Sequence, residues 1–416
     1  MQHAPTLLVF VATYVLIAFR RLAILPIGRP AGALAGACAM VVLATIEPRW
    51  GIDVHGAFGA VEPNTIGLLF GMMLIAGAFA EAGFFDHAAK LLVSRQWSPV
   101  GLLYGTTIGA GILSALLVND PVCVLGAPVV NAMAQRARVD RIPYLFGLAM
   151  GANAGSAMTL AGNPQNMLVA HLSGLSYRDY LVRGGPAGFL ALVTTAFVLH
   201  ILFRKRLVVR NNVAETNVSD VALSRWDVGV AAFIMLGVSI AFLAGANLAF
   251  AALTGSAVLL LVRRRDPAPL FTNVTWTVLV FFAALFIVAA AFQRTGLAET
   301  ALSATKPWIP ESRNAATASL AAILTLGCQV VSNVPFILLG EPFIRSLPDP
   351  TLAWTTTALA TTLAGNLTLL GSVANIIVIE TAKAEDEIGF VTYIKAGIPV
   401  TIASLVVGIG YLLLTT

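Results

Sequence analysis

The feature of this sequence that most constrains its fold is a succession of apolar stretches. There are about a dozen of them, each close to the ~20 residues that cross a bilayer as a helix. Only 11% of the 416 residues are charged and 58% are hydrophobic, with a mean hydropathy of +0.86, so the chain cannot cover a water-soluble protein with charge. The sequence therefore predicts an all-α polytopic membrane protein with one membrane domain.

About ten full transmembrane helices are predicted from hydropathy. They lie near residues 4–19, 31–46, 64–81, 142–171, 185–203, 226–244, 246–262, 274–292, 351–380 and 396–414. Two of these spans, 142–171 and 351–380, contain polar interruptions near their middle and are therefore expected to be broken helices.

Two further apolar segments, residues 99–133 and 315–344, do not fit this scheme. Each would form a straight helix of about 45–52 Å, too long for one crossing and too short for two crossings with a turn. Each carries an asparagine near its middle, Asn119 in "LVNDPV" and Asn333 in "VSNVPF". Both segments are predicted to be re-entrant hairpins.

The basic residues indicate membrane topology rather than nucleic-acid binding. The net charge is +5, but Lys and Arg are scattered beside the apolar segments. If both hairpins return to the side they came from, the cytoplasmic loops collect 18 of the 25 Lys and Arg residues, as the positive-inside rule requires. This topology places both termini outside a bacterial-type inner membrane. Residues 204–225 are then predicted to be a cytoplasmic linker that only connects the two halves of the chain. A partner ATPase and a homodimer are left open.

The two halves of the chain show internal repetition. "AGAFAEAGFFDHAAK" aligns with "AAAFQRTGLAETALS", and "YLVRGGP" aligns with "YIKAGIP", both at an offset of 213 positions. Asn119 and Asn333 differ by 214 positions. Each half is expected to have five complete crossings and one hairpin, so the second copy is upside down. The sequence therefore predicts inverted repeats over residues 1–203 and 226–416, which are typical of secondary transporters.

Four polar interruptions, two in each repeat, define a predicted site near the membrane midplane. Unpaired backbone groups at membrane depth cost several kcal/mol each unless they line a buried or wet cavity. Short neutral side chains there supply hydrogen-bond donors and acceptors, and free carbonyls can coordinate Na+. The candidate substrate- or ion-binding residues are Asn119, Gly162, Asn163, Asn166, Ser332, Asn333, Gly371, Ser372 and Asn375.

Asp120 is the candidate proton-coupling residue. An ionised carboxylate at membrane depth is costly and is by default a functional group. Desolvation favours its protonated form, so this carboxyl group can carry a proton between the two sides. The alternative is that Asp120 only caps a helix at a solvated hairpin tip. Its counterpart in the second repeat, Val334, is uncharged.

Neither catalysis nor metal binding is predicted. The five histidines are scattered and the H-E-x-x-H pattern of zinc proteases is absent. Cys38, Cys123 and Cys328 all lie within apolar segments and lack metal-ligand spacing. We therefore expect no enzymatic activity, no cofactor and no bound metal.

The four motifs and their order resemble those of the ion transporter superfamily. This superfamily contains ArsB-type arsenite carriers, NhaD-type sodium/proton antiporters and divalent-anion/sodium symporters. The resemblance extends over almost the whole chain and implies a moving part that carries both hairpins in an elevator-like alternating access. The Asn119-Asp120 tip is most similar to ArsB-type carriers, because the sodium-coupled carboxylate carriers have Ser-Asn-Thr at both tips.

The resulting prediction is proton-coupled efflux of a small neutral metalloid hydroxide, arsenite or antimonite. An ionised Asp120 would repel an anion, whereas arsenous acid needs only hydrogen-bond partners. In this hypothesis Asn119 and Asn333 orient the solute. The alternatives are a sodium/proton antiporter, with Na+ as the coupled ion, or a sodium-coupled carboxylate or anion symporter of the same superfamily.

Overall fold

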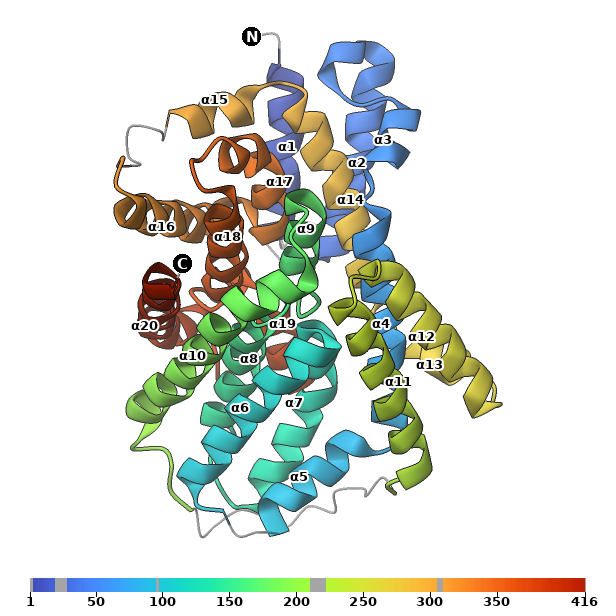
Figure 1. Cartoon of the computed structure of the whole chain (residues 1–416), viewed down its shortest axis with the longest axis vertical. Coiled ribbons are helices and arrows are strands. Elements are labelled where there is room, and N and C mark those ends of the chain that lie inside the picture. Colours follow the sequence, from blue (N-terminus) through green and yellow to red (C-terminus); the bar gives the residue numbers. More distant parts are fainter. Residues whose placement is uncertain (1–2, 19–27, 95–96, 210–221, 305–309, 416) are drawn as a thin grey trace.

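The computed structural model describes residues 3–18, 28–94, 97–209, 222–304 and 310–415, which leaves residues 210–221 of the predicted linker outside the described ranges. Within these ranges the chain is helical, apart from an isolated bridge between Val139 and Val209 (Figure 1). Seven of the described helices are long and apolar enough to cross a membrane, and three apolar helices are shorter. The chain is an all-helical, multi-pass membrane protein.

The seven long helices are α4 (Pro63–Glu81), α6 (Pro99–Leu117), α10 (Tyr177–Phe203), α11 (Arg225–Leu243), α14 (Trp276–Gln293), α16 (Arg313–Val331) and α20 (Phe390–Thr415). The shorter apolar helices are α1 (Ala4–Ala18), α2 (Arg29–Ile46) and α12 (Leu248–Arg263). The other described helices are η1 (Pro48–Trp50), α3 (Val54–Ala60), α5 (Phe84–Ser94), α7 (Asn119–Arg136), α8 (Arg141–Ser156), α9 (Pro164–Ser173), α13 (Ala268–Thr272), α15 (Leu297–Ser303), α17 (Asn333–Arg345), α18 (Pro350–Ala364), η3 (Leu369–Gly371) and α19 (Val373–Thr381).

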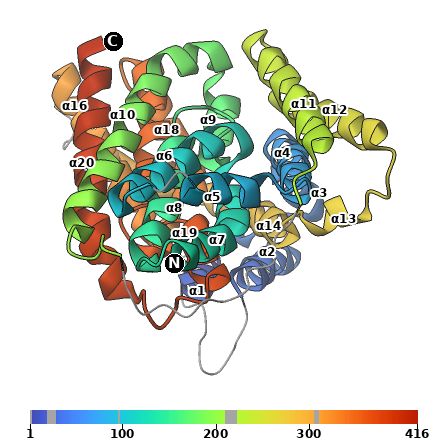
Figure 2. The ribbon, with the colours of Figure 1, turned by 90° about the horizontal axis from the view of Figure 1, so that it is seen from below.

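The helices form two groups that lie side by side, as Figure 2 shows. The peripheral group consists of α1, α2, α4, α11, α12 and α14, and the central group of α6–α10 and α16–α20. Packing is extensive within each group and sparser between them. The chain passes from the peripheral to the central group through α5 and through α15, which lie at opposite ends of the molecule in Figure 1, and returns between α10 and α11.

A glycine with positive φ directly precedes each of these connecting helices. Gly83 precedes α5 with φ of 74°, and Gly296 precedes α15 with φ of 68°. Glycine adopts positive φ readily because it has no Cβ. The same local turn therefore recurs 213 positions apart, at the two places where the chain leaves the peripheral group.

Each segment expected to be a hairpin forms two helices joined by one residue. Val118 joins α6 to α7 with φ of 74°, and Ser332 joins α16 to α17 with φ of 71°. Positive φ is rare for residues other than glycine, above all for β-branched ones, and costs about 1–3 kcal/mol where it occurs. Such strained turns persist only where the surrounding structure holds them, and they are concentrated at functional sites.

The spans 142–171 and 351–380 are both interrupted. α8 ends at Ser156 and α9 begins at Pro164; α18 ends at Ala364 and α19 begins at Val373 after the short helix η3. The second helices are capped by their own side chains: Asn163 Oδ1 accepts from the Asn166 amide at 2.8 Å, and Ser372 Oγ accepts from the Ala374 amide at 3.3 Å. Asn and Ser at these places therefore start a new helix after each break.

α6 and α8 pack with almost no space between their backbones. A Cβ atom on Gly155 would lie 2.1 Å from the Cα of Gly111, and one on Gly151 would lie 2.4 Å from the Thr107 carbonyl oxygen. Membrane helices approach this closely only where small residues face each other. The contact fixes α8, whose C-terminal end leads into the first break.

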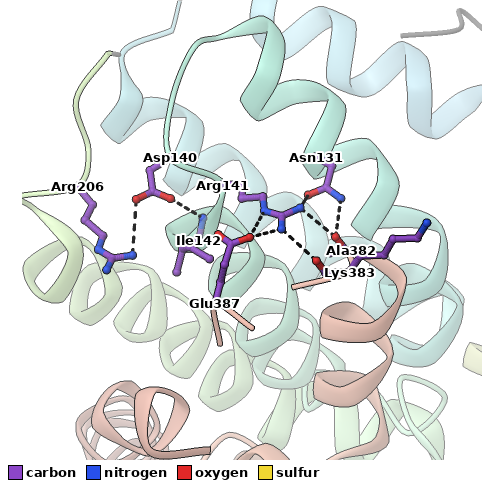
Figure 3. A network of polar contacts seen from close by, with 8 residues as sticks. All are labelled: Asn131, Asp140, Arg141, Ile142, Arg206, Ala382, Lys383 and Glu387. Atoms are coloured by element: carbon purple, nitrogen blue, oxygen red, sulfur yellow. Dashed lines mark hydrogen bonds and ion pairs between the residues drawn. The ribbon is translucent and has the colours of Figure 1, made fainter. Parts of the chain in front are cut away.

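A network around Arg141, shown in Figure 3, joins the two halves of the central group. The Arg141 guanidinium donates to the carbonyl oxygens of Ala382 and Lys383 at 3.0 and 3.1 Å, directly after α19, and pairs with Glu387. Asn131, from α7, donates to the same Ala382 carbonyl at 3.1 Å and accepts from Arg141 at 3.3 Å. A cation suits this place, because the last carbonyls of a helix carry partial negative charge.

We expect Arg141→Met to lower the free energy of unfolding by about 1–3 kcal/mol, because the Lys383 carbonyl and Asn131 Oδ1 lose the Arg141 donor and the Ala382 carbonyl keeps only Asn131. The loss would appear as a lower melting temperature of the purified protein in detergent. Arg49→Met is the matched control. Arg49 is exposed and, among the described residues, pairs with Glu47 alone; such an exposed ion pair contributes less than about 1 kcal/mol. Equal melting temperatures for the two variants would contradict the assigned role of Arg141.

Candidate functional site

The four interruptions converge on one buried cavity of about 20 Å³ between the central group and α14. This is enough space for roughly one water-sized molecule. From the first repeat the cavity is lined by Asn119, Asp120, Pro164 and Gln165, from the second by Ser332, Asn333, Val334, Gly371, Ser372 and Val373, and from α14 by Phe281 and Phe282.

Six of the ten candidate residues, counting Asp120, therefore line the cavity, and four do not. Gly162, Asn163, Asn166 and Asn375 lie behind it and hold the broken helices together. Asn163 donates to Ser156 Oγ and Thr362 Oγ1 at 2.8 and 3.1 Å, and Thr362 donates to Asn166 Oδ1 at 3.1 Å. The Gly162 carbonyl accepts from the Asn119 amide at 3.0 Å, which ties the first hairpin tip to the first break.

Three amide oxygens at this cavity are buried without a hydrogen-bond partner among the described residues. They are Asn119 Oδ1, Gln165 Oε1 and Asn333 Oδ1. Buried polar atoms are nearly always paired in proteins, and an unpaired one costs about 1–3 kcal/mol. Three of them around one cavity define a site whose ligand supplies hydrogen-bond donors or positive charge.

Asp120 is the one acid among the described lining residues, and its side chain is buried, with the residue only 2% exposed. Among the described residues, none forms a hydrogen bond or an ion pair with the Asp120 carboxyl group. It lies in the first turn of α7. The helix N-terminus carries partial positive charge and favours the ionised carboxylate.

Four helices begin at the cavity, so several dipoles act on it together. Lining residues belong to the first turns of α7, α9, α17 and α19. Their N-terminal ends compensate the charge of Asp120 without a basic side chain, and none of the described lining residues is Lys, Arg or His. The site can therefore hold one carboxylate at membrane depth, but it offers little for a second negative charge.

Sequence reasoning missed three kinds of site residue. Gln165 lies between the candidates Asn163 and Asn166 but was not selected. Phe281 and Phe282 come from an apolar span with no distinguishing signal. Asn153 and Asn366 lie deeper and are hydrogen-bonded to each other at 3.0 Å. They are 213 positions apart, so the repeat offset could have singled them out.

A second cavity adjoins the site. It measures about 230 Å³, shares Phe281 and Val373 with the central cavity, and extends to Glu380 at the end of α19. Its other lining residues are mostly apolar and come from both groups of helices. Phe281 and Val373 therefore lie between the polar site and this wider space.

Another cavity, of about 430 Å³, lies between α4 and α9. Beside it, His171 and Glu62 approach to 3.6 Å and link the central to the peripheral group. Burial opposes ionisation of Glu62, but hydrogen bonds from Thr65 and Asn64 outweigh it and hold the pKa of this carboxyl below its ordinary value. Glu62 is therefore ionised at neutral pH and caps the start of α4.

Broken helices that meet at a buried polar cavity between two helical groups define the class of secondary transporters. The sequence profile of the citrate transporter family (CitMHS) matches residues 14–364. The chain belongs to this family, which confirms the resemblance to the ion transporter superfamily, and it is a transporter and not an enzyme.

Its relatives are mostly transporters of similar length. The chain is 27% identical to the silicon efflux transporter LSI3 of Oryza sativa, over 95% of this chain and 94% of that protein. It is 25% identical to the putative transporter arsB of Dictyostelium discoideum, over 94% and 88%. An uncharacterized transporter of Mycobacterium tuberculosis, Rv2684, is 29% identical over 97% and 96%.

Two solved structures share the fold. The YdaH transporter of Alcanivorax borkumensis superposes with a TM-score of 0.58 at 16% identity, covering 98% of this chain and 97% of that one. MtrF of Neisseria gonorrhoeae, described as an antimetabolite efflux pump, gives a TM-score of 0.51 at 11% identity, covering 99% and 95%. At these identities the likeness concerns the fold alone.

Proposed function

We propose that this protein exports a small, neutral metalloid hydroxide in exchange for protons. The solute class includes arsenous, antimonous and silicic acids, which carry hydroxyl groups and no net charge. The observation that carries the proposal is the lining of the central cavity: Asp120 beside three unpaired amide oxygens, with no basic side chain among the described lining residues. Hydroxyl groups are the donors that such a lining can pair.

Relatives and cavity chemistry support this solute class over an anion. Two relatives bear names that refer to silicon efflux and to arsB. Citrate, which names the family, has three carboxylates and would meet Asp120 without a cation to offset the repulsion. The cavity holds about one water-sized molecule, so every candidate solute requires it to widen, and a metalloid hydroxide requires far less widening than citrate.

In this proposal, transport is coupled to protons because a proton and the solute compete for Asp120. The ionised carboxylate only accepts hydrogen bonds and can pair with a solute hydroxyl. The protonated carboxyl carries an O–H that can donate to an amide oxygen across the cavity, which removes acceptors that the solute needs. Proton and solute then bind alternately, and alternating access turns this competition into exchange.

The proposed transport cycle uses inverted repeats and an elevator-like movement. The repeats cover residues 1–203 and 226–416, with re-entrant hairpins at 99–133 and 315–344, and the central group moves against the peripheral group. Equivalent turns at Gly83 and Gly296 and at the two hairpin tips support the repeats. We further propose that the protein lies in a bacterial-type inner membrane with both termini outside. Association with a partner ATPase or as a homodimer is left open.

The experiment uses purified protein in liposomes, with pH and Na+ gradients imposed independently. An acidic lumen should drive uptake of arsenite, antimonite or silicic acid without Na+. The same liposomes are offered citrate, Na+ and Li+. Uptake of citrate with Na+ would replace the proposal by a carboxylate symporter, and proton-driven uptake of Na+ or Li+ would replace it by a sodium/proton antiporter.

A further inference from the structure

Asn153 lies behind the cavity and uses the full hydrogen-bonding capacity of its side chain. Its amide oxygen accepts from Asn119 Nδ2 and from Ser372 Oγ, both at 3.1 Å. Its amide nitrogen donates to Asn366 Oδ1 at 3.0 Å and to Asn375 Oδ1 at 2.9 Å. The residue is 2% exposed and does not line the cavity. It therefore connects the first hairpin tip, the first broken helix and the second broken helix.

The orientation of these amides is set by backbone carbonyls. Asn366 Nδ2 donates to the Met150 carbonyl at 3.1 Å, and Asn375 Nδ2 donates to the carbonyls of Gly365 and Thr368 at 2.7 and 3.1 Å. A carbonyl can only accept, so the amide nitrogens of Asn366 and Asn375 must face these atoms. Their oxygens must then face Asn153.

The orientations of Asn366 and Asn375 fix the orientation of the Asn153 amide, which in turn fixes that of Asn119 at the cavity. Since two amide oxygens face Asn153 from one side, its nitrogen must point to them and its oxygen must point to Asn119 and Ser372. Asn119 then turns its nitrogen toward Asn153 and its oxygen toward the cavity, where that oxygen has no partner. Ser372 donates its hydroxyl proton to Asn153 and accepts from the Ala374 amide with one of its lone pairs. These bonds direct the Asn119 amide nitrogen and the Ser372 hydroxyl proton toward Asn153.

We infer that Asn153 is the positioning residue that turns the unpaired Asn119 oxygen toward the cavity, and that it thereby favours solutes that donate hydrogen bonds. Asn153 acts through Asn119 and never touches the solute. The inference deepens the proposed function and rests on it. If Asn119 were free to turn, it would present its nitrogen as readily as its oxygen, and the cavity would lose its preference for hydroxyl groups.

A double-mutant cycle measured with arsenite tests whether Asn153 acts through Asn119. Asn153→Ala should raise KM for arsenite about tenfold, because it releases the Asn119 amide. In an Asn119→Ala background the same substitution should raise KM much less than tenfold, since only the Ser372 hydroxyl is left for Asn153 to orient. Additive effects in the cycle would overturn the inference while leaving the proposed function in place.

A second variant covers the case in which Asn153→Ala does not fold. Asn153→Asp, held as the neutral acid by burial against two amide oxygens, keeps a carbonyl oxygen that can accept from Asn119 and Ser372 and retains one O–H donor for Asn366 or Asn375 in place of two N–H donors. It should keep KM within about twofold of the wild type even if its melting temperature falls. A KM as high as that expected for the alanine variant would contradict orientation of Asn119 as the cause.

Asn131→Ala is the matched control, because Asn131 also bridges α7 to the segment after α19 but lies away from the cavity. It should leave KM for arsenite unchanged. A wild type that carries none of the hydroxides would overturn the proposed function, and the inference about solute class with it. A wild type that carries arsenite but follows an additive cycle would overturn the inference alone.

Discussion

Replacing Asp120 with asparagine should abolish proton-driven uptake of arsenite into inverted membrane vesicles. Asparagine has nearly the same shape and still offers an amide oxygen to a hydroxyl group, but it cannot bind and release a proton. The proton gradient would then have no carrier inside the cavity. We expect a loss of about a hundredfold or more, the range in which removal of a proton-transferring side chain ordinarily falls.

The same variant should keep solute–solute exchange. In the absence of a gradient, labelled arsenite should still enter vesicles preloaded with unlabelled arsenite, because the cavity still binds the solute. Asp179→Asn is the matched control: Asp179 is an exposed acid in the first turn of α10, away from the cavity, and its loss should leave proton-driven uptake intact. Undiminished proton-driven uptake by Asp120→Asn would show that the coupling group lies elsewhere.

Adding one methyl group at Gly155 should prevent stable folding. The alanine Cβ would lie 2.1 to 2.3 Å from the Cα, oxygen and carbonyl carbon of Gly111, and none of these backbone atoms can move without displacing α6. Overpacking a core with side chains costs about 1–3 kcal/mol, and a clash between two helix backbones should reach or exceed that range. We expect Gly155→Ala to elute as aggregate in size-exclusion chromatography, or to melt far below the wild type.

Gly109→Ala provides the control on the same pair of helices. Gly109 also lies in α6, but a Cβ there meets no atom within 4 Å. Alanine at a helical glycine in open space should stabilise the helix by about 0.5–1 kcal/mol. A Gly155→Ala protein that melts like the wild type would mean that α6 and α8 are less closely packed than described.

The membrane class and the positions of the helix interruptions could be predicted because their causes are local. Apolar runs of bilayer length must be helical in lipid, and Asn, Ser, Pro and Gly interrupt them where the backbone needs side-chain partners. Connecting helices α5 and α15 and the starts of α10 and α20, at Tyr177 and Phe390, were not predicted. Each of these segments contains charged residues, so hydropathy does not detect it as part of a membrane span. Position within an apolar run does not by itself predict burial: Cys123 and Cys328 are buried, but Cys38 is exposed.

The candidate site was predictable as a set of motifs but not as an arrangement. Asn119, Asp120, Asn333 and Ser372 line the cavity, while Asn163, Asn166 and Asn375 of the same motifs cap and join the broken helices behind it. The motif residues are of the same chemical kind in both roles. Which of these residues face the cavity and which lie behind it depends on how the helices pack after each break.

The sequence by itself determined that this chain crosses the membrane many times and that its polar interruptions recur in two copies, because hydropathy and helix capping depend on neighbouring residues. Only the tertiary structure decided which atoms face the cavity. That choice depends on hydrogen bonds between distant positions, such as Asn153 with Asn366 and with Asn375, and on carbonyls that leave each amide a single orientation.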